Sequence, residues 1–121
     1  MMKKILIADD EPDIVKIVQF RLKGQGYEVI IAVNGQEALD MAGKVNPDLI
    51  LLDVSMPFLK GDEVCQKIKA DEALKHIPVL LMTASTRIAN EESVLQLGAQ
   101  GFILKPFETE EFLETVGKFL K

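Results

Sequence analysis

The chain has 121 residues, a size typical of one domain that buries about two-thirds of the surface its unfolded form would expose. Apolar residues make up 48% and charged residues 27%, which excludes disordered and fibrous proteins. The formal net charge of -5 argues against direct binding of nucleic acid, because phosphate binding needs a basic patch. We therefore expect one domain over residues 1–121.

Cysteine content and the N-terminus indicate the compartment. The chain has one cysteine, Cys65, so it carries no disulfide framework and suits a reducing environment. The N-terminal segment MMKKILIADDEP has a short apolar run that acids interrupt, which excludes a signal peptide and a membrane span. We expect a cytoplasmic protein without membrane contact.

Short apolar runs alternate along the chain with longer stretches of helical period. Strands are predicted at residues 4–8, 27–31, 48–52, 77–82 and 101–104. Helices are predicted at residues 12–24, 35–44, 61–70, 87–97 and 108–120. In the last helix, Phe112, Val116 and Phe119 share one face and form an apolar stripe that would pack on a sheet.

This alternation predicts an α/β fold with a doubly wound parallel sheet. The third and fourth strands are apolar on both faces, which is typical of a parallel sheet covered by helices on both sides. Right-handed crossovers then give a three-layer sandwich of five strands and five helices. The flavodoxin-like strand order 2-1-3-4-5 is expected.

Acidic residues stand at the carboxyl ends of the first and third predicted strands. The first strand is followed by Asp9, Asp10 and Glu11, and the third by Asp53. In a doubly wound sheet these two ends meet where the winding reverses, which is where ligands bind. The clustered carboxylates would repel one another by several kcal/mol. Mg²⁺ would offset this repulsion with oxygen ligands, and the absence of histidine and thiol ligands disfavours zinc and copper.

The ends of the fourth and fifth strands supply groups that suit a phosphoryl ligand. Thr83 offers a hydroxyl donor, and Lys105 offers a cation held in front of a proline. A phosphoryl group on Asp53 would face both this ammonium and the metal ion. The set therefore indicates electrostatic preorganisation for phosphoryl transfer.

Four short motifs fall in order at these strand ends: ADDE, DVSMPFLKG, MTAS and GFILKPF. Together they resemble the receiver domains of two-component response regulators, over nearly the whole chain. The resemblance implies that Asp53 is the phosphoacceptor. It also implies Mg²⁺, or Mn²⁺ in its place, held by Asp9, Asp10, Asp53 and the backbone carbonyl of Ser55.

The resemblance further implies a conformational switch. Thr83 would move toward the phosphoryl group, and Phe102 would rotate into the vacated space. Without the family pattern, an aromatic residue at position 102 is more simply a core residue. Phenylalanine also lacks the hydroxyl that many relatives have there. Ala84 would leave room for the phosphoryl group, while Ser55 and Ser85 would tune its lifetime.

The implied function is signalling rather than enzymatic turnover, although a receiver promotes its own phosphorylation and dephosphorylation. The phosphoryl group would come from a sensor histidine kinase or a histidine phosphotransfer protein. The face built from the fourth helix, fifth strand and fifth helix would then control binding of a downstream protein. Receivers of winged-helix transcription factors tend to dimerise through charged pairs on the fourth and fifth helices. Residues 108–121 contain acids and two lysines but no arginine, so we expect a monomer.

Several alternatives remain open from the sequence. The chain is either a single-domain regulator or a receiver excised from a larger regulator or hybrid kinase. A haloacid-dehalogenase-type phosphatase also forms an aspartyl phosphate, but its D-x-D motif would need an acid where Ser55 stands. A flavodoxin-like nucleotide binder would have its phosphate repelled by Asp9 and Asp10. No residue in the sequence favours a receiver that works without phosphorylation.

Overall fold

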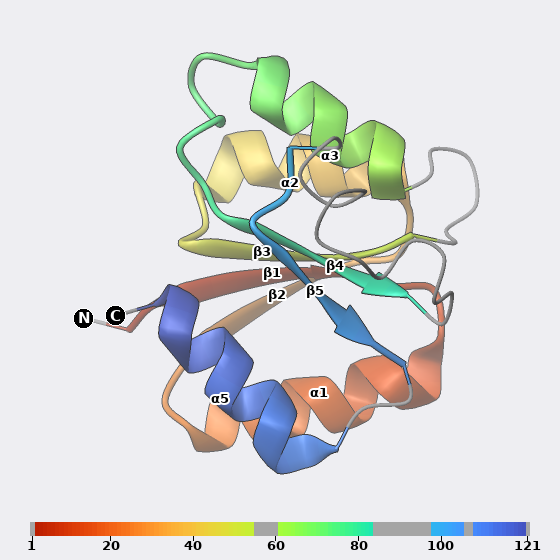
Figure 1. The fold of residues 1–121 in the computed structure, drawn as a ribbon, viewed down its shortest axis with the longest axis vertical. Helices are drawn as coiled ribbons and strands as arrows, with labels where there is room; N and C mark the ends of the chain where they lie inside the picture. Colours follow the sequence, from red (N-terminus) through yellow and green to blue (C-terminus); the bar gives the residue numbers. More distant parts are fainter. Residues whose placement is uncertain (1, 55–60, 84–97, 106–107, 121) are drawn as a thin grey trace.

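The computed structural model describes residues 2–54, 61–83, 98–105 and 108–120, and its centre is one parallel sheet (Figure 1). The five strands are β1 (Lys4–Ala8), β2 (Glu28–Ala32), β3 (Leu49–Asp53), β4 (Val79–Thr83) and β5 (Gly101–Leu104). They lie in the order β2-β1-β3-β4-β5, with every neighbouring pair parallel. The predicted doubly wound topology is confirmed.

Helices cover both faces of this sheet. They are α1 (Pro12–Gly24), α2 (Gly35–Val45), α3 (Gly61–Ala70) and α5 (Thr109–Phe119). Figure 1 shows α1 and α5 on one face and α2 and α3 on the other, which confirms the three-layer architecture. The helix predicted at residues 87–97 lies outside the described residues. Among the helices that are described, none has the length and apolar character needed to cross a membrane.

The core consists of two apolar layers, one on each face of the sheet. Alternate residues of β3 enter different layers because successive side chains of a strand point to opposite faces. Ile50 and Leu52 pack with Ile68 of α3, whereas Leu51 packs with Phe112 of α5 on the other face. All five residues of β3 are buried, so this central strand is held rigidly from both sides.

Local sequence signals set the helix ends. Pro12 occupies the first turn of α1, where its missing N–H is not needed. Asn34 caps α2, because its Oδ1 accepts a hydrogen bond of 2.8 Å from the backbone N–H of Glu37. At the other end of α2, Asn46 adopts a left-handed conformation with φ of 48°, a frequent termination of helices.

Two strands extend further toward the candidate site than predicted. β3 includes Asp53, which pairs with Met82, and β4 includes Thr83, which pairs with Leu104. The backbone N–H of Val54 also donates to the Met82 carbonyl at 3.0 Å. Both candidate side chains are thus anchored on hydrogen-bonded strand positions.

Candidate functional site

Three carboxylates meet at the carboxyl ends of β1 and β3. These strands are neighbours, with Ala8 opposite Leu52, so the residues that follow lie side by side. One carboxylate oxygen from each of Asp9, Asp10 and Asp53 lies within 4.8 Å of the other two. Asp9 and Asp53 are only 1% and 4% exposed, whereas Asp10 is exposed. The predicted meeting of the acidic strand ends is therefore observed.

Strand alternation explains why these side chains converge. Ile7 and Leu51 face the layer formed with α1 and α5, and Asp9 and Asp53 each come two positions later. Lys105 comes two positions after Ile103, which belongs to the same layer. The side chains of Asp9, Asp53 and Lys105 therefore lie on the sheet face that α1 and α5 cover, just beyond the last apolar residues of that face.

Lys105 lies among the acids. Its Nζ is 2.9 Å from Asp9 Oδ2, 3.1 Å from Glu11 Oε1 and 3.5 Å from Asp53 Oδ2, and its side chain is 9% exposed. The backbone N–H of Lys105 donates to the Thr83 carbonyl at 2.7 Å, which extends the pairing of β4 with β5. The side chain of Lys105 therefore starts from a fixed position.

The acids control the charge state of Lys105. Burial alone would lower the pKa of this ammonium group. Hydrogen bonds to Asp9 and Glu11, together with the charges of Asp53 and Asp9, outweigh burial and raise the pKa above its usual value of 10.5. Lys105 is thus a fixed cation at physiological pH.

Thr83 and Phe102 lie on the other face of the sheet. Thr83 comes two positions after Leu81, whose side chain packs in the layer formed with α2 and α3. Phe102 is opposite Leu81 in the neighbouring strand and packs against the same layer. The two residues proposed to switch therefore share one face of adjacent strands. Ser55, Ala84 and Ser85 lie outside the described residues.

The donor set suits a hard divalent cation. Asp9, Asp10 and Asp53 offer carboxylate oxygens close enough to share one ion, and among the residues that the structure describes no nitrogen or sulfur ligand belongs to the group. Oxygen ligands of this kind are those that Mg²⁺ uses, usually together with several waters. The carboxylates of Asp9, Glu11 and Asp53 lie near the Lys105 ammonium, and Asp10 adds a further negative charge to the group, so a dication would relieve the remaining repulsion.

The contact between Glu11 and Lys105 was not predicted from the sequence, although Glu11 was expected in the same crevice. The ion pair joins residues separated by 94 positions, and the direction of a long side chain cannot be read from spacing. One signal was available: a glutamate directly before Pro12 stands where a helix usually begins with a shorter capping residue.

Comparisons with known proteins agree on one family. The sequence model described as "Response regulator receiver domain" matches residues 5–117. The polar-differentiation response regulator DivK of Brucella ovis is 38% identical over 120 residues, which cover 99% of this chain and 98% of DivK.

Solved structures show the same likeness. The chemotaxis protein CheY4 of Vibrio cholerae has a TM-score of 0.91 and 35% identity, with 99% of this chain and 100% of CheY4 covered. The response regulator TrrA of Thermotoga maritima, solved in complex with Mg²⁺ and BeF, has a TM-score of 0.88 and 36% identity, covering 98% of this chain and 100% of TrrA. Both the sequence and the fold are thus similar to those of receivers.

Proposed function

This chain belongs to the response regulator receiver domain family of two-component signalling, and on that premise we propose that Asp53 accepts a phosphoryl group in a Mg²⁺-dependent reaction. The arrangement that carries the proposal is the buried Asp53 carboxylate, grouped with Asp9 and Asp10 and 3.5 Å from Lys105 Nζ. The family match favours this function over a dehalogenase-type phosphatase or a nucleotide binder.

The metal would be held by Asp9, Asp10, Asp53 and the Ser55 carbonyl, with Mn²⁺ able to replace Mg²⁺ there. When bound, it neutralises charge on the phosphoryl oxygens. Asp53 would supply the nucleophile: one carboxylate oxygen forms a bond to phosphorus as the bond between phosphorus and the phosphohistidine nitrogen breaks, and that nitrogen keeps the electron pair. Lys105 would face the transferred group, since its ammonium already contacts Asp53.

The phosphoryl group would change the balance between two conformations. Thr83 would donate its hydroxyl to a phosphoryl oxygen, and Phe102 would rotate on the same face of the sheet. Ala84 would leave space for this movement, while Ser55 and Ser85 would influence attack by water. The face that the family resemblance assigns to the predicted fourth helix, which lies outside the described residues, together with β5 and α5, would then change its affinity for a partner. Such a change needs differential stabilisation of a few kcal/mol.

The partners follow from this chemistry. The donor would be a sensor histidine kinase or a histidine phosphotransfer protein, and the output would be contact with a downstream protein rather than nucleic acid. We further propose that residues 1–121 act as one monomeric receiver in the cytoplasm. The chain would promote its own phosphorylation and dephosphorylation, but it would not catalyse turnover of a metabolic substrate.

Intact-mass measurement after incubation with acetyl phosphate and Mg²⁺ tests the central step. Wild-type protein should gain the mass of one phosphoryl group, and the gain should disappear when Mg²⁺ is chelated or in Asp53→Asn. Asp13→Asn removes an exposed carboxylate from the first turn of α1 and should keep the gain. An adduct that persists in Asp53→Asn would show that another residue is the acceptor.

A further inference from the structure

Glu11 is the acid that the proposed function leaves without a role. Its Oε1 accepts a hydrogen bond of 3.1 Å from Lys105 Nζ, and its backbone N–H donates to Asp9 Oδ1 at 2.9 Å. Lys105 Nζ in turn donates to the other oxygen of the same carboxylate, Asp9 Oδ2, at 2.9 Å. Glu11 therefore touches both members of the Lys105–Asp9 pair.

The helix does not determine where the Glu11 side chain points. Glu11 is the residue before α1, with extended backbone angles of φ -94° and ψ 103°, and it makes no side-chain capping hydrogen bond. Short side chains such as that of aspartate usually cap this position by accepting from the N–H groups of the first turn. The carboxylate of Glu11 instead reaches Lys105 beyond β5, so the tertiary ion pair fixes it.

The three acids share one ammonium group unequally. Lys105 donates hydrogen bonds to Asp9 and Glu11, while its distance to Asp53 is longer, at 3.5 Å. An ammonium has three N–H donors, so a carboxylate that occupies one of them competes with any new acceptor. The side chain of Glu11 is 56% exposed, whereas that of Asp9 is fully buried. Water can therefore solvate the Glu11 carboxylate when it releases Lys105, and breaking this ion pair costs little.

We propose that Glu11 is a positioning residue that holds Lys105 on the Asp9 side of the site and thereby sets how readily the ammonium reaches a phosphoryl group on Asp53. This inference rests on the proposed function. It gives Glu11 two separable effects: its charge attracts Mg²⁺, and its contact with Lys105 opposes binding of the anionic phosphoryl group.

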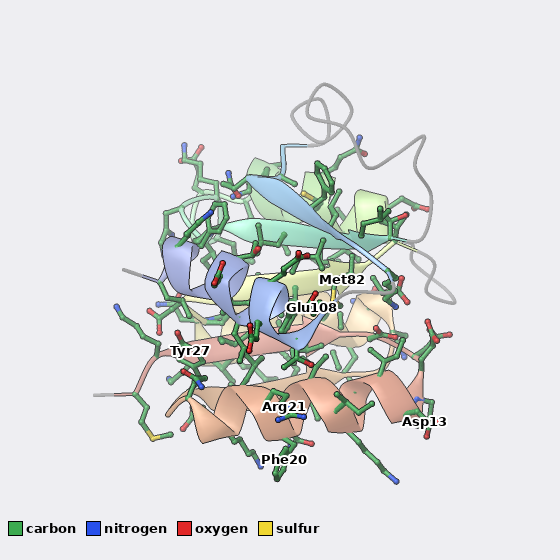
Figure 2. All side chains as sticks on the ribbon, turned by 60° about the horizontal axis from the view of Figure 1, so that its bottom comes forward. Asp13, Phe20, Arg21, Tyr27, Met82 and Glu108 are labelled. Carbon is green, nitrogen blue, oxygen red and sulfur yellow. The ribbon has the colours of Figure 1, made fainter. Side chains whose placement is uncertain are left out.

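Three variants separate these effects in equilibrium binding. Glu11→Gln removes the charge and weakens the contact. Glu11→Asp keeps the charge, but its shorter side chain is suited to cap α1 and cannot reach as far toward Lys105. Asp13→Asn removes an equal charge from the first turn of α1, shown in Figure 2, and no ion pair joins Asp13 to Lys105 among the described residues. Calorimetry measures Mg²⁺ affinity, and fluorine NMR measures beryllofluoride affinity at saturating Mg²⁺.

The expected pattern is specific. Glu11→Gln should bind Mg²⁺ about two- to fivefold more weakly and beryllofluoride about two- to fivefold more tightly, the range expected for one partly exposed ion pair. Glu11→Asp should bind beryllofluoride more tightly while its Mg²⁺ affinity stays within about twofold of wild type. Asp13→Asn should leave beryllofluoride affinity within the same margin.

Other outcomes would overturn the positioning role. If Glu11→Asp binds beryllofluoride as the wild type does, or if Asp13→Asn reproduces the effect of Glu11→Gln, the contact with Lys105 has no influence of its own. An unchanged beryllofluoride affinity in Glu11→Gln has the same meaning. Failure of the proposed function is distinct, because wild-type protein would then bind no beryllofluoride and gain no phosphoryl group on Asp53.

Discussion

Lys105 Nζ lies 2.9 Å from Asp9 Oδ2, although 96 residues separate the two positions in the chain. β3 and β4 lie between β1 and β5 in the sheet, so the Lys105 side chain passes over the ends of both central strands. Asp9 and Asp53 are buried carboxylates that share this one cation. The stability of the metal-free protein therefore depends on an ion pair at the site itself.

Replacing Lys105 by methionine should destabilise the metal-free protein by about 3 kcal/mol, because two buried carboxylates lose their counter-charge. Mg²⁺ should restore part of this loss, since a dication can neutralise the same acids. Urea unfolding with a chelator and with Mg²⁺ measures both quantities. Lys16→Met changes an exposed lysine of α1 and should alter stability little. Equal losses in the two variants would show that the ion pair contributes nothing particular.

The raised pKa of Lys105 predicts a loss of stability at alkaline pH. In the folded state, burial is outweighed by the hydrogen bonds to Asp9 and Glu11 and by nearby charges, so the group holds its proton above the usual value of 10.5. The folded state then binds more protons than the unfolded state, and the free energy of unfolding falls as pH rises from 10.5 through the folded pKa. This contribution is fully present below 10.5.

Urea unfolding of the chelated protein across this pH range tests the effect. The difference in unfolding free energy between wild type and Lys105→Met should shrink as pH rises, because only the wild type has this group to titrate. A difference that stays constant or grows would contradict the raised pKa.

The sequence was sufficient to predict the topology and the meeting of the acids, for physical reasons that particular residues illustrate. The unbroken apolar run before Asp53 requires burial on both faces, which implies a parallel sheet between helix layers. Once the strand order is set, Asp9 and Asp53 must end neighbouring strands. The predicted carboxyl ends of the third and fourth strands were less accurate. Asp53 and Thr83 belong to these strands because they pair with Met82 and Leu104, and local patterns do not encode this pairing.

Side-chain direction was the part that spacing could not supply. The position of the Lys105 ammonium among Asp9, Glu11 and Asp53 depends on rotamers of a long side chain and on the distances between strands that are far apart in sequence. The sequence correctly predicted that these residues lie in one crevice. It could not show that Glu11 and Asp9 are nearer to Lys105 than Asp53 is.

Mg²⁺ should stabilise the folded chain, because only the folded state brings Asp9, Asp10 and Asp53 within reach of one ion. At one hundred times its dissociation constant, the gain should be about 2.7 kcal/mol. Asp10→Asn should reduce this gain by weakening binding, whereas Asp13→Asn should keep most of it. Thermal unfolding at a series of Mg²⁺ concentrations gives the comparison. Equal Mg²⁺ dependence in the two variants would place the ion elsewhere.

Replacing glycine by alanine should have opposite effects on stability at two positions, Gly101 of β5 and Gly43 of α2. A methyl group on Gly101 would lie 3.1 Å from Leu80 Cδ2 and 3.5 Å from Phe119 Cζ, between the sheet and α5. Because Leu80 is fully buried, Gly101→Ala should destabilise the protein by about 1 to 2 kcal/mol through overpacking.

Gly43 of α2 is the matched position, since a methyl group there meets nothing within 4 Å. Gly43→Ala should stabilise the protein by about 0.5 to 1 kcal/mol, because alanine loses less conformational freedom in a helix than glycine does. Chemical unfolding of both variants checks the pair. If Gly101→Ala also proved stabilising, Leu80 and Phe119 would have to yield without cost, and the contact between β5 and α5 would be looser than the distances imply.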